Sequence, residues 1–140
     1  MRRVTREAKK HLPIIELARS LVSHLPPKDW AGEVDALHRF VRDNIRYIKD
    51  VQGVETVAVP EYTLRVGQGD CDDKSVLLAS LLQAIGHPAK FVAIGFQPFR
   101  YNHVFVETKI GPRWVALETT ENVDAGWRPQ NIVSIMERNV

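Results

Sequence analysis

The hydrophobic positions in the first third of the chain follow a helical repeat. Between residues 5 and 25, apolar side chains recur three, four and seven positions apart until Pro26-Pro27 ends the pattern. A second helix is predicted over about residues 30–44, with Asp29 as its N-cap. Residues 46–68 follow no clear repeat, so we expect a long ordered loop, a kind of segment that often carries function.

The clearest helical signal starts at Cys71 and runs to about Ile85. Asp70 is placed to cap this helix, and Gly86 suits a left-handed helix end. Its apolar positions share one face and comprise Leu77, Leu78, Leu81, Leu82 and Ile85. Cys71 is therefore predicted to lie in the first turn of a buried helix.

Three segments rich in β-branched and aromatic residues follow the cysteine helix. They span residues 90–96, 101–110 and 113–119, and each is predicted to be a strand. Gly111-Pro112 separates the last two and indicates a hairpin turn. The tail at residues 132–136 is compatible with either a short strand or a helix.

Length and composition are those of one soluble globular domain. The chain has 140 residues, of which 44% are hydrophobic and 26% charged, so we expect a single domain over residues 1–140. A formal net charge of +2 gives no reason to expect a nucleic-acid partner. Five of the first ten residues are basic, and we interpret this segment as a solvated, frayed helix end. The longest strongly apolar segment, residues 76–85, is too short to span a bilayer, which needs roughly 20 residues.

The single cysteine bears on the cellular compartment. One cysteine cannot form an internal disulfide, which favours a reducing environment. The polar start of the chain lacks the apolar stretch of a signal peptide. We therefore expect a cytoplasmic protein.

Cys71 has the local environment of a nucleophile. Helix N-termini favour a thiolate, and the first-turn amides can bind an oxyanion. A thiolate also needs a nearby cation, usually an imidazolium. Of five histidines, only His103 lies in a predicted strand downstream of the cysteine helix. His38 is expected to be a packed or surface residue of its helix, and His87 a surface residue.

The hairpin register brings an acid to His103. An even loop at Gly111-Pro112 places His103 opposite Thr120. Phe105 then lies opposite Glu118, so His103 and Glu118 are diagonal neighbours on one face, about 7–8 Å apart at the backbone. Glu118 could therefore orient the imidazole as the third member of a triad, whereas an odd loop would remove it from the site.

The acids beside the cysteine do not indicate a metal site. Asp72 and Asp73 follow Cys71 directly, but divalent sites need several convergent ligands, and calcium loops have longer spacing and no thiol. We expect no metal and no cofactor.

Three sequence blocks resemble those of the transglutaminase-like superfamily. The block GDCDDKS at residues 69–75, followed by GHPA at 86–89, resembles the family's cysteine helix. NHVFVE at 102–107 resembles its histidine strand, and WVALETT at 114–120 resembles its acid block. The matched region covers residues 67–120. The upstream stretch at residues 40–47 resembles the preceding helix of small phage and prophage members.

The resemblance implies an α+β, papain-like fold, in which N-terminal helices and a cysteine-bearing helix pack on an antiparallel sheet. Residues 1–66 would supply the N-terminal helices and the long loop. The implied triad is Cys71, His103 and an acid, although Glu118 replaces the family's usual Asp. The implied oxyanion partner lies upstream of the cysteine, and Gln68 is our candidate beside the Cys71 amide.

These features predict a thiol-dependent acyl-transfer enzyme that acts on an amide of a protein or peptide. If water resolves the acyl-enzyme, the protein is a cysteine peptidase or amidase, which the small size favours. If an amine resolves it, the protein is a transglutaminase. The remaining alternative is a non-catalytic member that binds a protein partner. A virion-associated role is compatible with each of these if the chain derives from a phage.

Overall fold

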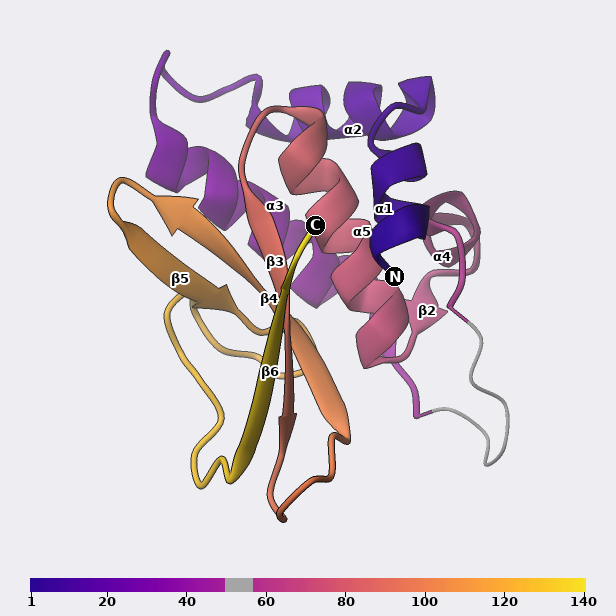
Figure 1. The fold of residues 1–140 in the computed structure, drawn as a ribbon. Coiled ribbons are helices and arrows are strands. Elements are labelled where there is room, and N and C mark those ends of the chain that lie inside the picture. Colours follow the sequence, from indigo (N-terminus) through magenta and orange to yellow (C-terminus); the bar gives the residue numbers. More distant parts are fainter. Residues whose placement is uncertain (50–56) are drawn as a thin grey trace.

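The computed structural model describes residues 1–49 and 57–140 as helices packed on one face of an antiparallel sheet (Figure 1). The helices in these residues are α1 (Arg2–Ala8), α2 (Leu12–Val22), α3 (Trp30–Asn44), α4 (Pro60–Val66) and α5 (Cys71–Ala84). The main sheet consists of β3 (Ala89–Gly95), β4 (His103–Ile110), β5 (Arg113–Leu117) and β6 (Ser134–Asn139). Two short strands, β1 (Arg46–Tyr47) and β2 (Gln68–Gly69), form a separate parallel pair. This arrangement confirms the predicted α+β fold.

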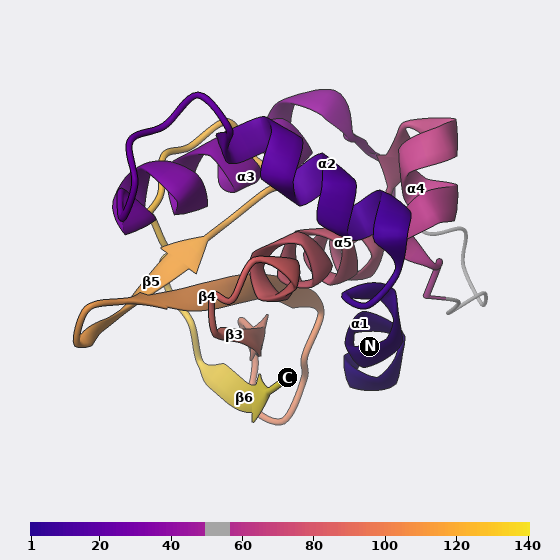
Figure 2. The same cartoon turned by 90° about the horizontal axis from the view of Figure 1, so that it is seen from above.

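Helix α5 is the centre of the molecule. It lies between the sheet and the other helices, as the view from above shows (Figure 2). Every residue from Lys74 to Leu82 is buried. A helix covered on all sides is expected to be apolar all round, and the buried serines of α5 have hydrogen-bond partners, whereas Oε1 of Gln83 has none among the described residues. Ser75 and Ser80, for example, donate hydrogen bonds to the carbonyl oxygens of Val104 and Val76.

The predicted helix over residues 5–25 is two helices. The chain breaks at residues 9–11, and α2 restarts with Pro13 in its first turn, where a missing N–H costs nothing. The basic segment is also not a frayed end, because Thr5 and Ala8 are buried where α1 packs against α5. The second prediction is confirmed: α3 spans Trp30–Asn44, and the Asp29 carboxylate accepts a hydrogen bond from the Gly32 N–H at 3.1 Å.

The expectation of a long loop over residues 46–68 was wrong for the part that the structure describes. This stretch contains β1, α4 and β2, while residues 50–56 lie outside the described residues. Pro60 starts α4, and Gly67 ends it with a φ of +70°. With seven residues, α4 is too short to show a helical repeat in the sequence.

The strands lie close to their predicted positions. The sheet order is β5-β4-β3-β6, with antiparallel neighbours throughout. The hairpin pairs Ile110 with Arg113 and continues to Val106 with Leu117, which is the register of the predicted even loop. The undecided tail forms β6 and pairs with β3. No helix among residues 1–49 and 57–140 is long and apolar enough to cross a membrane.

Candidate active site

Cys71 is the first residue of α5, and its position is fixed by a capping box. The Asp70 carboxylate accepts a hydrogen bond from the Asp73 N–H at 2.8 Å, and the Asp73 carboxylate accepts one from the Asp70 N–H at 3.2 Å. Gly69 precedes the cap because a Cβ there would lie 2.7 Å from the Cβ of Asp73. The pairing of Gly69 with Tyr47 in the β1–β2 ladder fixes the position of the chain just before the helix. The sulfur therefore lies at the positive end of a rigid, buried helix.

His103 and Glu118 form the contact that the hairpin register predicted. The Nε2 atom of His103 lies 2.6 Å from Oε2 of Glu118. Glu118 follows directly after β5 and is 1% exposed, and its second oxygen accepts hydrogen bonds from the Thr120 N–H at 3.1 Å and the Thr120 hydroxyl at 2.9 Å. Because Nε2 faces Glu118, Nδ1 is the ring nitrogen left for the Cys71 sulfur.

The electrostatics of this pair favour an imidazolium. Burial of the His103 ring opposes a positive charge, but contacts with Cys71 and Glu118 outweigh burial and raise the pKa of His103 to about 10. Burial likewise opposes the Glu118 charge, yet the contacts with His103 and Thr120 hold the pKa of Glu118 below its ordinary value. The pair is therefore charged at neutral pH.

Two buried residues that the sequence analysis did not assign to the site form hydrogen bonds with the backbone around it. His38 is fully buried on α3, and its Nε2 lies 2.6 Å from the carbonyl oxygen of Glu118. Burial lowers the pKa of His38, so the ring is neutral and donates this hydrogen bond through Nε2. Lys74, on the second turn of α5, donates to the Ile45 carbonyl at 2.6 Å, and burial lowers its pKa to about 8.

The signals for these residues were weak or absent in the sequence. His38 falls on the apolar face of α3, so its burial could be expected, but its partner lies 80 residues away. Lys74 lies between Asp73 and Ser75 in the sequence and carries no local sign of its partner. His87 was expected at the surface, and this was wrong: the ring is buried, and Nε2 lies 2.8 Å from a carboxylate oxygen of Glu33.

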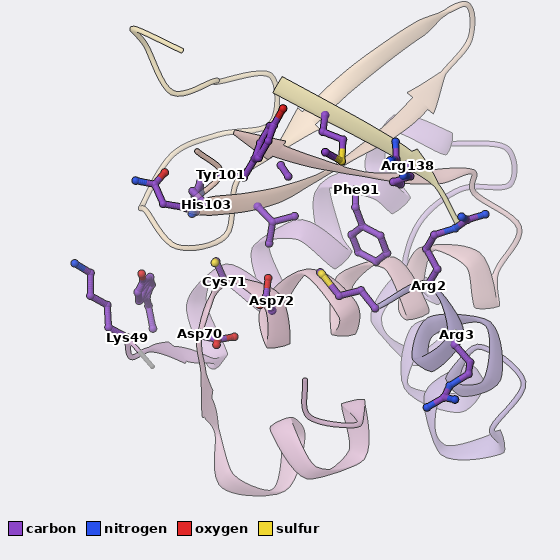
Figure 3. Close-up of a pocket in the computed structure, with 16 residues that line it drawn as sticks. Arg2, Arg3, Lys49, Asp70, Cys71, Asp72, Phe91, Tyr101, His103 and Arg138 are labelled. Carbon is purple, nitrogen blue, oxygen red and sulfur yellow. The ribbon is translucent and has the colours of Figure 1, made fainter. Parts of the chain in front are cut away.

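Cys71 and His103 open into a pocket of about 700 Å³ (Figure 3). Figure 3 shows the Cys71 sulfur and the His103 ring on the same side of this pocket, with Phe91 farther along it. Gln68, our oxyanion candidate, is exposed on β2 and is not among the lining residues that the structure describes, so its role stays a prediction. Within residues 1–49 and 57–140, no three histidine, cysteine or acidic side chains are grouped as a metal would require.

Comparison with solved structures places this arrangement in a known fold. The chain is similar to a candidate protease from Parabacteroides distasonis ATCC 8503, with a TM-score of 0.69 and 15% identity over 82% of this chain and 25% of that one. It is also similar to a candidate cysteine protease from Cytophaga hutchinsonii, with a TM-score of 0.62 and 19% identity over 91% of this chain and 48% of that one. EGTA-treated LapG of Legionella pneumophila gives a TM-score of 0.62 and 16% identity over 88% of this chain and 72% of that one.

The chain thus spans a quarter to a half of the first two of these proteins, and identities this low show a shared fold alone. No curated protein sequence matches the chain at a significant level. The family model for the transglutaminase-like superfamily matches residues 15–119, three quarters of the chain. This match includes Cys71, His103 and Glu118, the residues that carried the sequence resemblance. The chain belongs to the transglutaminase-like superfamily and has its cysteine-protease-like fold.

Proposed function

We propose that this protein is a cysteine peptidase or amidase that forms an acyl-enzyme on Cys71. One observation carries the proposal: the His103 ring is held by the buried Glu118 carboxylate beside a cysteine at a helix N-terminus, at the wall of an open pocket. An imidazolium in this place stabilises a thiolate, which is the nucleophilic form of cysteine.

The reaction would proceed in two halves. The Cys71 sulfur attacks the carbonyl carbon of the substrate amide and forms a carbon–sulfur bond, and the carbonyl oxygen takes the negative charge. His103 then gives its proton to the departing amine as the carbon–nitrogen bond breaks, leaving a thioester on Cys71. Water attacks the thioester while His103 takes one of its protons. The product acid leaves, and the thiolate–imidazolium pair is restored.

The negative oxygen needs a hydrogen-bond donor close to the sulfur. The Cys71 N–H, in the first turn of α5, supports this role because it lies beside the nucleophile and along the helix dipole. The Asp73 N–H is already used by the Asp70 carboxylate in the capping box. Since the side chain of Gln68 is exposed, we favour the Cys71 amide as the main donor in this proposal.

Acylation by p-nitrophenyl acetate, an activated ester that needs no specific binding site, tests the proposal. We expect wild type to release a burst of p-nitrophenol and to carry an acetyl group on Cys71, detected by mass spectrometry of the only cysteine peptide. Cys71→Ala and His103→Ala should show neither. His24→Ala, which changes an exposed histidine on the loop after α2, should behave as wild type.

An unreactive Cys71 in folded wild type would contradict the proposal and favour a non-catalytic, protein-binding member of the fold. If the acyl-enzyme forms, its fate separates hydrolysis from transamidation. Adding a primary amine such as dansylcadaverine should leave most of the product as acetate if water is the acceptor. Predominant transfer to the amine would instead identify a transglutaminase.

A further inference from the structure

The pocket extends well beyond Cys71 and ends in a pair of arginines. Arg2 comes from the start of α1 and Arg138 from β6; both line the pocket, and Figure 3 shows both on the far side of Phe91 from Cys71. Both side chains are exposed, and among the described residues neither forms an ion pair with a carboxylate. The one hydrogen bond of Arg138 that the structure shows goes to the carbonyl oxygen of Glu137. The pair therefore presents two guanidinium groups to whatever occupies the pocket.

The charges along the pocket are unevenly placed. Its acids are Asp70 and Asp72, which flank Cys71 at the start of α5, and the Asp70 carboxylate is turned toward its own helix as the cap. Arg2 and Arg138 lie at the other end, while Figure 3 shows the Arg3 side chain directed away from them and Lys49 on the side of Cys71 and Asp70. The end remote from the cysteine is thus cationic, and the charge complementary to it is a carboxylate.

An apolar floor joins the two ends. Phe91 and Val104 are buried under the pocket, and Met136 is partly exposed along it. These side chains offer nothing to a charged group but suit apolar substrate side chains. A ligand that fills the pocket would therefore be apolar in its middle and negative at its far end.

The strand register gives the length of such a ligand. Along β3, the backbone of His103 is opposite Ile94, and that of Arg138 is opposite Phe91, three residues farther. An odd step directs the two side chains to opposite faces of the sheet, and His103 lines the pocket from the first position of β4, so the register gives the backbone distance alone. Three residues of strand cover about 10 Å, and the two strand spacings from β4 to β6 add about 10 Å at right angles. The diagonal is roughly 14 Å, which four residues of extended peptide cover at about 3.3–3.6 Å each.

We propose that the site is selective for acidic peptides: Arg2 and Arg138 bind a glutamate or aspartate side chain about four residues from the amide that Cys71 attacks, and apolar residues in between lie on Phe91 and Met136. This specificity rests on the proposed peptidase function, since it concerns the same pocket. It assigns α1 a role in substrate binding, although this helix lies outside the three sequence blocks of the family.

Binding to the Cys71→Ala variant tests the specificity without requiring turnover. The probes are two fluorescein-labelled nonapeptides with an apolar centre, one with a pair of glutamates at its N-terminal end and the other with the pair at its C-terminal end. Each has a matched control peptide in which glutamines replace the glutamates. In fluorescence anisotropy at low ionic strength, we expect one glutamate peptide to bind about tenfold tighter than its glutamine counterpart. That ratio should fall toward one as salt is added, because both arginines are exposed to solvent.

Charge reversal provides the decisive comparison. In the Cys71→Ala background, Arg2→Glu/Arg138→Glu should lose the preference for glutamate and bind a matched lysine peptide better. Arg19→Glu, a reversal at an exposed site on α2, should keep the original preference. Circular dichroism confirms that each variant is folded.

Equal affinity of Cys71→Ala for glutamate and glutamine peptides would overturn the proposal, as would a preference that survives the double reversal. Neither result would affect the chemistry at Cys71, which acylation by p-nitrophenyl acetate measures separately. Conversely, glutamate selectivity in a protein that cannot be acylated would retain the acidic-peptide site and refute the peptidase function.

Discussion

Replacing Glu118 by glutamine removes the negative charge that holds the His103 imidazolium, with little change in shape. One oxygen of Glu118 accepts two hydrogen bonds from Thr120, and the other contacts His103. A glutamine has a single acceptor oxygen, and the two Thr120 donors are expected to keep it. The NH₂ group would then face Nε2 of His103, which can accept that hydrogen bond only when it is deprotonated. The substitution therefore lowers the pKa of His103 through lost charge and through a reversed hydrogen bond.

The size of the effect follows from the burial of the pair. Two unit charges about 4 Å apart interact by about 4 kcal/mol at an effective dielectric constant near 20. Glu118 is 1% exposed and His103 17% exposed, so solvent screens part of this, and a loss of about 2–3 kcal/mol is expected. At about 1.36 kcal/mol for each factor of ten, the imidazolium population relative to neutral imidazole falls roughly 30- to 150-fold.

The rate of Cys71 alkylation by iodoacetamide reports this loss, since the chain contains one cysteine. Wild type should react rapidly near pH 6, well below the pKa of about 8.5 of a free thiol. Because the pKa of His103 in wild type is about 10, this loss leaves the ring protonated near pH 6 in Glu118→Gln as well, and the two proteins should alkylate at similar rates there. The variant should slow relative to wild type between about pH 8 and 9, where its imidazole is largely neutral while that of wild type is still charged.

Glu107→Gln is the matched control for this experiment. It neutralises another buried strand carboxylate, whose partners are Lys90 and Arg128 and not His103. Its alkylation profile should equal that of wild type. If Glu118→Gln follows the wild-type alkylation profile up to about pH 9, or if Glu107→Gln slows to the same degree as Glu118→Gln, Glu118 does not hold the imidazolium and the triad assignment is wrong.

Three further outcomes are expected. Lys74→Met should lower the free energy of unfolding by about 1–3 kcal/mol in urea titrations, because the buried Ile45 carbonyl loses its donor; an unchanged midpoint would show that water replaces it. Asp70→Ala should cost about 0.5–2 kcal/mol in the same assay, since the Asp73 N–H loses its cap. Because folding raises the pKa of His103 from 6.5 to about 10, its stabilising charge is fully present below pH 6.5 and lost as pH rises toward 10. The stability difference between wild type and His103→Ala should therefore shrink over that range, and a constant difference would contradict the assigned pKa.

The elements that could be predicted from the sequence are those with local signals. The capping pattern at Asp70 and the glycine after the helix fixed the bounds of α5 to within a residue. Side chains alternate between the two faces of a strand, so an even hairpin loop places His103 and Glu118 on the same face and an odd loop places them on opposite faces. The structure has the even loop. Strand propensity and the turn at Gly111 settled the rest of that hairpin.

The elements that were missed depend on distant contacts or short segments. Helix α4 has too few residues for a repeat, and the apolar repeat continues through the break between α1 and α2 at residues 9–11, which Pro13 follows in the first turn of α2. The burial of His87 depends on Glu33, 54 residues away in α3. The β6 strand exists because β3 offers it an open edge, which the sequence of the tail alone does not reveal. For His87 and β6, the deciding partner is tertiary.

The same reasoning explains why the N-terminal helices matter to a site whose motifs lie downstream of them. Glu118 is held on two sides: its carboxylate meets His103, while its backbone oxygen accepts a hydrogen bond from His38 on α3. The C-terminal end of α3 is in turn tied to the cysteine helix, because Lys74 donates to the carbonyl of Ile45. Cys71, His103 and Glu118 therefore belong to elements that are linked through buried hydrogen bonds, so their mutual geometry is set by folding. A thiolate–imidazolium pair needs this rigidity, since a ring free to turn away would leave the thiolate without its cation.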